Sequence, residues 1–313
     1  MGDVAATSER MRIGVMPSMG ERSLGAEAPH GRTPRFRDIQ QMAQVAEQVG
    51  FDSFWLADHL LYEFPDIGVN GAWEVFTFLS GIAATTSRIQ LGPLVACTSF
   101  RNPALLAKMA DAVDEISDGR FILGLGAGWH KPEYDAFGYP FDHRASRFEE
   151  ALKIIVPLLR EGKVDFQGQY YEARECELRP RGPSRNGPPI WIGADKPRML
   201  RLVAQYADAW NTVWHRSAEK VARAYPAMLE ACQEVGRDPA TLTLTAGTHA
   251  RILAPGESCP EGERGICGTP EQVAEAISGF EAEGVKHLVV VVRPEDVTGV
   301  ERFGEVIELV RRV

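Results

Sequence analysis

The amino-acid sequence predicts an α/β protein, a TIM-type (β/α)8 barrel that carries an insertion between its fourth and fifth strands. Eight short apolar segments alternate along the chain with eight segments whose apolar residues recur at helical spacing. Such alternation predicts a parallel sheet with helical crossovers, and eight units predict closure into a barrel. An open, doubly wound sheet is the alternative interpretation.

Most of the expected strands are rich in apolar residues, as strands buried on both faces are, and the stretch at 89–97 is almost unbroken. The expected strands cover residues 12–16, 51–57, 89–97, 121–126, 189–193, 209–213, 242–253 and 287–292. The expected helices cover residues 36–49, 75–86, 103–117, 147–161, 198–206, 218–235, 270–283 and 300–313. Their ends carry the usual signals: Gly50 follows the first helix, and Asn102 and Thr269 precede helices that begin with proline.

Residues 163–189 interrupt this alternation. The alternating stretch at 164–172, with Gly168 at its centre, predicts a small hairpin followed by a proline-rich connection. We expect one barrel domain over residues 11–313 that contains this insertion. Residues 1–10 lack the apolar stretch of a signal peptide, so we expect a flexible tail there.

The longest plain loops all follow strands, whereas the links that lead into strands are short. Loops that follow the strands of a parallel barrel gather at its C-terminal end, where the functional sites of such barrels lie. The sequence therefore predicts a site at that end, beside the loops at 17–35, 60–74 and 254–268.

Composition narrows the possible partners. The formal net charge of −9 makes nucleic acid and anionic membranes poor candidates. No apolar run approaches the roughly 18 residues of a membrane span. The cysteines are scattered, so we expect neither a disulfide framework nor a structural zinc site, and a reducing cytoplasm is the expected location. They are Cys97, Cys176, Cys232, Cys259 and Cys267.

Two ionisable residues, Asp58 and His59, end the second expected strand with no glycine or proline before them. A buried strand that delivers a carboxylate and an imidazole to the mouth of a barrel is typical of an active site. The plainer interpretation is that Asp58 caps the next element and His59 hydrogen-bonds to it. No further cluster of His, Asp or Glu at the strand ends suggests a bound metal.

Glycines mark two other strand ends. The run from Gly124 to Gly128 does not fit a dinucleotide motif, because it ends the fourth strand rather than the first. We interpret it as a strand end that lets something flat and polar approach the backbone. Gly92–Pro93 inside the third strand predicts a bulge, since proline is normally excluded from central strands.

Gly193–Ala194–Asp195 leads from the fifth strand into a helix. The free N–H groups of a helix N-terminus favour an anion such as phosphate, and Lys196 and Arg198 are nearby cations. Because Asp195 would repel a phosphate, we place its side chain as the helix N-cap. An ordinary strand-to-helix turn is the alternative.

Four stretches, in chain order and covering nearly the whole chain, resemble the luciferase-like superfamily of flavin- and F420-dependent oxidoreductases, which includes the bacterial luciferase-like monooxygenases. They are FDSFWLADH at 51–59, the segment 91–138, VDFQGQYYE at 164–172 and the segment 188–211. The resemblance implies a (β/α)8 barrel whose insertion between strands four and five matches 163–189. It also implies that FMN or the deazaflavin F420 binds at the mouth.

The resemblance assigns the cofactor contacts to several strand ends. The phosphate is expected on Gly193, Ala194, Asp195 and Lys196. A bulge with a non-proline cis peptide, placed at Leu94–Val95, is expected to support the ring, with Cys97 and Thr98 just beyond it. The glycine-rich strand end is expected to meet the cofactor through Gly126, Ala127, Gly128 and Trp129.

Asp–His at the end of strand two resembles the F420-using branch. There the Asp lies against the deazaflavin, which implies that role for Asp58, and the His acts as acid or base, which implies that His59 is catalytic. An imidazole suits this role because its pKa lies near neutrality. The acidic tail of F420 needs basic groups, for which Lys196, Arg198, Arg22 and Arg32 are candidates.

The predicted activity is hydride transfer between F420 and a small organic substrate. An FMN-dependent monooxygenase, using O₂ and reduced flavin from a separate reductase, is the alternative. Two less favoured alternatives are a flavin-binding protein without turnover and a metal-dependent hydrolase. Related F420-dependent sugar-phosphate dehydrogenases have Glu where Trp129 stands, so we expect a less polar substrate. The family is commonly dimeric, which predicts a homodimer.

Other polar and aromatic residues have weaker signals. His130 and Glu133 follow the glycine-rich turn and are expected either in the pocket or on a solvated loop. Trp210 and Asn211 are candidates for a cleft or for the core. Structural roles are expected for Met16 and Trp55 in the barrel interior and for His30, His143, His215, His249 and His287.

Overall fold

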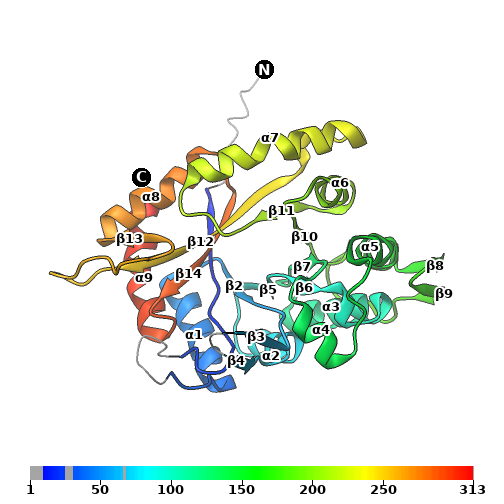
Figure 1. Ribbon diagram of the computed structural model, residues 1–313, viewed down its shortest axis with the longest axis horizontal. Helices are drawn as coiled ribbons and strands as arrows, with labels where there is room; N and C mark the ends of the chain where they lie inside the picture. Colours follow the sequence, from blue (N-terminus) through cyan, green and yellow to red (C-terminus); the bar gives the residue numbers. More distant parts are fainter. Residues whose placement is uncertain (1–9, 25–30, 66–67, 313) are drawn as a thin grey trace.

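Eight parallel strands form the barrel that the sequence predicts. The computed structural model describes residues 10–24, 31–65 and 68–312 (Figure 1). Around the barrel run β1 (Arg12–Val15), β2 (Ser53–Leu56), β5 (Gln90–Pro93) with β6 (Ala96–Cys97), β7 (Leu123–Gly126), β10 (Ile190–Gly193), β11 (Ala209–Thr212), β12 (Thr243–Ile252) and β14 (His287–Arg293). A parallel bridge between Leu91 and Phe121 joins β5 to the segment that enters β7, and β14 pairs with β1, so the ring is nearly closed.

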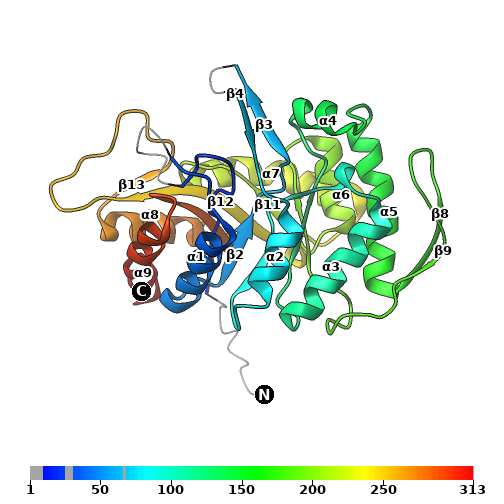
Figure 2. The same cartoon turned by 90° about the horizontal axis from the view of Figure 1, so that it is seen from below.

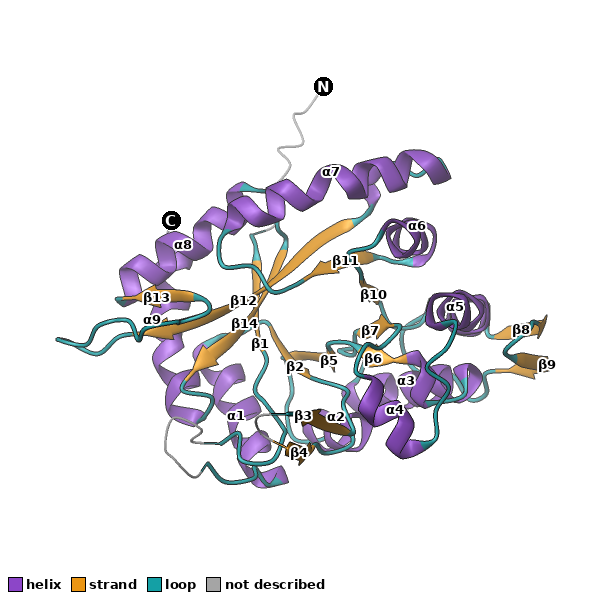
Figure 3. Cartoon of the chain, in the orientation of Figure 1, coloured by secondary structure: helices purple, strands orange, loops and turns teal. Residues whose placement is uncertain are grey.

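Helices surround this ring, as Figures 1 and 3 show. Gly50 ends the first helix in the left-handed conformation (φ 100°), and Asn102 and Thr269 accept hydrogen bonds from the first turns of their helices, as predicted. The crossover helices are α1 (Phe36–Val49), α2 (Val75–Ala83), α3 (Pro103–Ser117), α5 (Arg144–Glu161), α6 (Pro197–Tyr206), α7 (Ala218–Val235), α8 (Pro270–Ala282) and α9 (Val297–Arg312).

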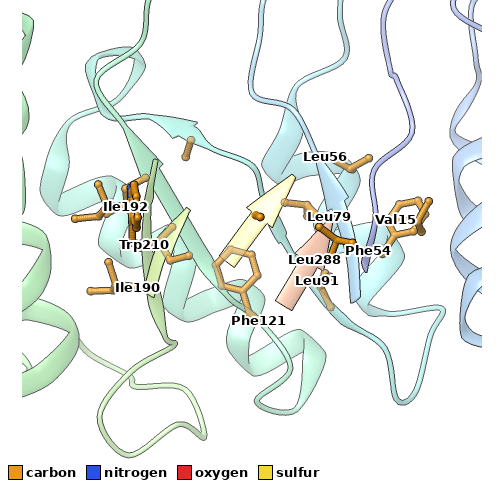
Figure 4. Close-up of a cluster of buried hydrophobic side chains, with 14 of the residues drawn as sticks. Val15, Phe54, Leu56, Leu79, Leu91, Phe121, Ile190, Ile192, Trp210 and Leu288 are labelled. Atoms are coloured by element: carbon orange, nitrogen blue, oxygen red, sulfur yellow. The ribbon is translucent and has the colours of Figure 1, made fainter. Parts of the chain in front are cut away.

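The core has two layers because side chains alternate between the faces of each strand. Phe54 and Leu56 point outward and pack under the helices, together with the other labelled side chains of Figure 4. Trp55, between them in sequence, points into the barrel, where its ring centroid lies 4.5 Å from that of Trp191. The predicted interior position of Trp55 is therefore confirmed.

Several segments depart from the prediction of plain loops. Residues 60–74 contain a hairpin of β3 (Leu61–Phe64) and β4 (Gly68–Gly71), and α4 (Lys131–Phe137) follows β7. In Figure 2 both lie at the top of the view, and because both follow the ends of barrel strands they belong to the C-terminal mouth. The predicted hairpin in the insertion is confirmed as β8 (Lys163–Gln167) and β9 (Glu172–Glu177).

The expectation of no disulfide is wrong. Cys259 and Cys267 are bonded, and their Cα atoms lie 5.9 Å apart. The cause is the loop between them, which reverses so that β13 (Ile266–Gly268) pairs with β12. Sequence spacing alone does not reveal such a return of the chain.

Some predictions concern parts of the chain that the structure covers only in part. Residues 1–9 of the predicted tail, and His30, lie outside the described residues. The single-domain assignment to 11–313 stays a prediction. None of the helices in the described ranges is long and apolar enough to span a bilayer.

A short polar chain crosses the barrel interior. The Trp55 indole donates to the Ser53 hydroxyl over 2.6 Å, and the same hydroxyl lies 2.6 Å from Nε2 of His287. Burial, aided by the nearby charge of Arg12, lowers the pKa of His287 to about 3. His287 is therefore neutral in the folded protein at neutral pH.

This burial predicts a pH dependence of stability. The unfolded chain binds a proton at His287 near pH 6.5 and the folded chain only near pH 3, so stability falls as the pH drops through this window. Between pH 7.5 and 5 we expect His287 to contribute a loss of about 2 kcal/mol of unfolding free energy. Urea unfolding at several pH values should show this additional fall of the unfolding free energy in the wild type and not in His287→Gln. Exposed His143→Gln is the control, and equal slopes in all three proteins would contradict the account.

Candidate functional site

A cavity of about 710 Å³ opens at the C-terminal ends of the strands. Its walls include every predicted site residue except Thr98, which is fully buried and whose hydroxyl donates to the Gly126 carbonyl over 3.4 Å. The predicted residues on the walls are Asp58, His59, Leu94, Val95, Cys97, Gly126, Ala127, Gly128, Trp129, Gly193, Ala194, Asp195 and Lys196. The volume is within the range of pockets that hold cofactors.

The third strand is broken at the floor of this cavity. The Leu94–Val95 peptide is cis, as the family resemblance predicts, and it separates β5 from β6. The bulge fits only because its neighbours are glycines. A Cβ on Gly126 would lie 2.6 Å from a methyl carbon of Val95, and one on Gly124 would lie 2.1 Å from the Pro93 carbonyl oxygen. The bulge thus presents the Val95 side chain to the cavity.

His59 is held by a buried carboxylate. Its Nδ1 lies 2.9 Å from Oε1 of Glu133, and Oε2 of Glu133 accepts the N–H of Leu60 over 2.9 Å. Glu133 is 1% exposed and belongs to α4, the helix that the sequence did not reveal. Because a carboxylate only accepts hydrogen bonds, Nδ1 carries a hydrogen and Nε2 is left to exchange the proton. Among the described residues, Nε2 has no hydrogen-bond partner.

The carboxylate of Asp58 is buried and hydrogen-bonded to other groups of the protein. Both of its carboxylate oxygens accept from the guanidinium of Arg101, at 2.6 and 3.0 Å, and one also accepts the N–H of Cys97 over 2.8 Å. Arg101 reaches Glu74 as well, over 2.6 Å. Burial opposes the charge on Arg101, but these two carboxylates outweigh it and raise the pKa. Asp58 therefore ties the end of β2 to β6.

The fifth strand end differs from the prediction in one respect. Asp195 is not the N-cap of α6: Lys196 is, and the Asp195 side chain is exposed and lies 3.3 Å from Lys196. The reason is Pro197, which occupies the first helical position and keeps the residue before it extended. Trp210, predicted either for a cleft or for the core, is buried in the core and donates to the Ala194 carbonyl over 2.9 Å.

The arginines near the end of β10, and the others considered for the cofactor tail, differ in their partners. Arg144 lines the cavity, donates to the Gly128 carbonyl over 2.6 Å and lies over the Phe141 ring. Arg198 pairs with Glu149 and Arg32 pairs with Asp38, so each is already compensated.

Sequence reasoning missed several residues of this site. It did not find Arg101 or Arg144, left Glu133 and His130 open, and gave no role to Tyr62 or Trp214. Glu133, Tyr62 and Trp214 line the cavity, and His130 is buried and accepts the N–H of Glu63 over 2.9 Å. A buried carboxylate such as Asp58 requires a partner, which is the one signal that could have led to Arg101.

The barrel, the broken third strand and the histidine at the mouth define a barrel oxidoreductase of the luciferase-like class. The sequence profile described as luciferase-like monooxygenase matches residues 11–258. The chain therefore belongs to the luciferase-like monooxygenase family.

Two curated relatives show the range of this family. The chain is 36% identical over 248 residues to the pyrimidine monooxygenase RutA of Enterobacter cloacae subsp. cloacae. This alignment covers 75% of this chain and 66% of that protein. It is 31% identical over 235 residues to the phthiodiolone/phenolphthiodiolone dimycocerosates ketoreductase of Mycobacterium bovis, covering 69% of this chain and 61% of that one. The chain thus spans about two thirds or less of the length of these two relatives.

A solved structure supports the fold. An F420-dependent secondary alcohol dehydrogenase, in complex with an F420–acetone adduct, superposes with a TM-score of 0.79 over 96% of this chain and 99% of that one. The sequences are 21% identical, so the likeness concerns the fold.

Removing the Arg101 side chain should destabilise the protein, because it leaves Asp58 buried and unpaired. We expect Arg101→Met to lower the unfolding free energy by about 3–5 kcal/mol. Asp58→Asn in the same chain should recover part of this loss. Arg201→Met, which removes an exposed pair with Glu234, should change it by less than about 1 kcal/mol. Urea unfolding measures all three, and equal effects of the two arginine variants would contradict the prediction.

Proposed function

We propose that the protein is a coenzyme F420-dependent oxidoreductase that transfers a hydride between the deazaflavin and a small organic substrate. The observation that carries this proposal is the pair of His59 and Glu133 at the mouth of the barrel. A histidine oriented in this way can give or take the proton that accompanies hydride transfer to a carbonyl or from an alcohol. The curated relative named as a ketoreductase, and the F420-dependent alcohol dehydrogenase with the same fold, support this class of reaction.

The residues at the mouth fit a deazaflavin. The Val95 bulge offers an apolar support for a flat ring, and Gly126 and Gly193, which line the cavity beside it, place no side chain there. Arg144 lines the cavity and supplies positive charge. Lys196 lines it too, but its charge is shared with Asp195 at 3.3 Å, and the start of α6 is a position that favours a phosphate. Once bound, the cofactor would supply a ring carbon that accepts or donates the hydride.

The side chains of this protein would handle the proton. Glu133 fixes the ring of His59 through its hydrogen bond with Nδ1, which leaves Nε2 to donate a proton to a substrate oxygen during reduction. In the reverse direction neutral Nε2 would accept the proton from an alcohol. Trp129, which is exposed at the rim with its ring 5.7 Å from that of His59, adds an apolar surface and favours a substrate of low polarity.

A second candidate is an FMN-dependent monooxygenase that uses O₂ and reduced flavin from a separate reductase. The observation in its favour is the 36% identity to the pyrimidine monooxygenase RutA. Either enzyme is expected to be a homodimer, by the family resemblance, and light scattering of the purified protein tests that expectation.

Cofactor titration separates the two candidates. We expect purified protein to change the fluorescence of F420 on binding, with a Kd at least about tenfold lower than that for FMN. The physical reason is that the bound F420 tail gains contacts with the cations at the rim, which also predicts weaker binding at higher salt. Tight binding of FMN without a response to F420 would overturn the proposal and favour the monooxygenase.

Substitutions at the histidine pair test the proton step. We expect His59→Ala to lower kcat by about 10²–10⁴ with the F420 Kd largely unchanged, because only the transition state loses the acid. Glu133→Gln should lower kcat less than His59→Ala does, since the amide oxygen can still accept the Nδ1 hydrogen and keep the ring in place. Asp135→Asn, on the exposed side of α4, is the control. Full turnover in His59→Ala would remove the role assigned to this residue.

A further inference from the structure

The disulfide between Cys259 and Cys267 lies outside the cavity that forms the site. It closes a ring of residues 259–267, which we call the disulfide loop, in the gold segment beside β13 in Figures 1 and 2. Cys259 is exposed, whereas Cys267 lies half-buried in β13. The two cysteines are only 8 positions apart, so their bond restrains the unfolded chain less than one that closes a long loop. Opening the bond should therefore leave the barrel folded.

The disulfide loop packs against β12. A Cβ on Gly265 would lie 2.1 Å from the His249 carbonyl oxygen, so the backbone of the loop meets this strand with no room for a side chain. Glu263 pairs with Arg251, two residues further along the same strand, over 2.6 Å. Because Glu263 and Gly265 both lie inside the ring, the disulfide restrains the segment that makes these contacts.

His249 connects the disulfide loop with the wall of the site. Its ring centroid lies 5.0 Å from that of Trp214. Gly247 on the same strand makes room for the Trp214 ring, since a Cβ there would lie 2.8 Å from a carbon of that ring. Trp214 is 40% exposed and lines both the main cavity and an adjoining cavity of about 180 Å³. A single residue therefore separates the loop from a wall that the two cavities share.

We propose that Cys259 and Cys267 form a thiol–disulfide exchange site that controls the order of this cavity wall. With the bond closed, the disulfide loop holds His249 in place, and His249 supports the Trp214 ring. When a small thiol or dithiol opens the bond, the loop loosens and the Trp214 ring becomes mobile. A ligand of the main cavity must then order its own wall and binds more weakly. This control acts whichever cofactor the protein uses.

The exchange begins at the exposed cysteine. A thiolate of the reductant attacks the sulfur of Cys259, the bond between the two cysteines breaks, and Cys267 leaves as a thiolate that takes a proton from water. A second thiol of the reductant then releases Cys259 from the mixed disulfide. One protein disulfide and two reductant thiols thus become two protein thiols and one reductant disulfide. An oxidised small disulfide drives the same steps in reverse.

Chemical labelling tests whether the bond exchanges in the folded protein. Dithiothreitol is added to the native protein, free thiols are alkylated, and mass spectrometry identifies the labelled cysteines. We expect Cys259 and Cys267 to be labelled, with buried Cys97 and Cys232 protected and the circular dichroism spectrum unchanged. A bond that opens only when the protein unfolds would contradict the proposal.

Fluorine NMR of protein labelled with 5-fluorotryptophan tests the connection to the cavity. The resonances are assigned from single tryptophan-to-phenylalanine variants. We expect the Trp214 resonance to shift or broaden on reduction, because its support through His249 is lost. The resonances of Trp55 and Trp191, which pack on each other inside the barrel, should stay unchanged. An unchanged Trp214 resonance after the bond has opened would make the bond purely structural and overturn the proposal.

Serine variants reproduce the reduced state without a reductant. The double variant Cys259→Ser, Cys267→Ser should give the reduced Trp214 resonance and no response to dithiothreitol, whereas Cys176→Ser should respond like the wild type. Glu263→Gln keeps the disulfide but weakens the pair with Arg251, so it should shift the same resonance in part. This single variant keeps the proposal testable if the double variant does not fold.

Ligand titration measures the effect on the site. F420 and FMN are each titrated into the oxidised wild type and the double serine variant. We expect the cofactor that binds the wild type to bind the variant at least about threefold more weakly. Equal affinities would contradict the proposal. If neither cofactor binds the wild type, the proposed function is wrong instead, and the labelling and NMR results still decide whether the disulfide controls the wall.

Discussion

The buried contact between Asp58 and Arg101 fixes the geometry on which the rest of the site depends. Through it the end of β2 is tied to the segment that leads into α3, and the same carboxylate accepts the backbone N–H of Cys97 in β6. Burying two charges is costly, and here the cost is offset by a two-pronged ion pair and a third hydrogen bond. Because Asp58 directly precedes His59, the same contact sets where the imidazole enters the cavity.

Two cavities adjoin the histidine that this contact positions. On one side, the Val95 bulge and the glycine-lined strand ends leave a flat space suited to a ring. On the other, Tyr62, Trp214 and His249 border a smaller, mainly apolar space. His59 borders both spaces and is held by Glu133, so groups in either space lie beside the same imidazole.

The fold could be predicted from the sequence because it depends on the spacing of apolar residues and on the order of the elements along the chain. The apolar composition of Phe51–Leu56, for example, predicts a buried strand without any knowledge of its contacts. Even the cis peptide at Leu94–Val95 was predicted, through the family resemblance. Glu133 was left open because its hydrogen bond to His59 joins residues 74 positions apart and depends on α4. Arg101 was missed for the same reason, since its partner Asp58 lies 43 positions away. The Cys259–Cys267 bond spans only eight residues, but it depends on the return of the chain that pairs β13 with β12. Asp195 was misplaced because Pro197 shifts the helix start by one residue.

The central claim is that Glu133 acts on the reaction only through His59. A double-mutant cycle tests it, with single-turnover rates of hydride transfer from reduced F420 to a ketone substrate measured in wild type, His59→Ala, Glu133→Gln and the double variant. We predict that Glu133→Gln slows the wild type but changes the His59→Ala enzyme by less than about twofold, because the two residues work as a unit. Independent, multiplicative losses in the double variant would contradict the account.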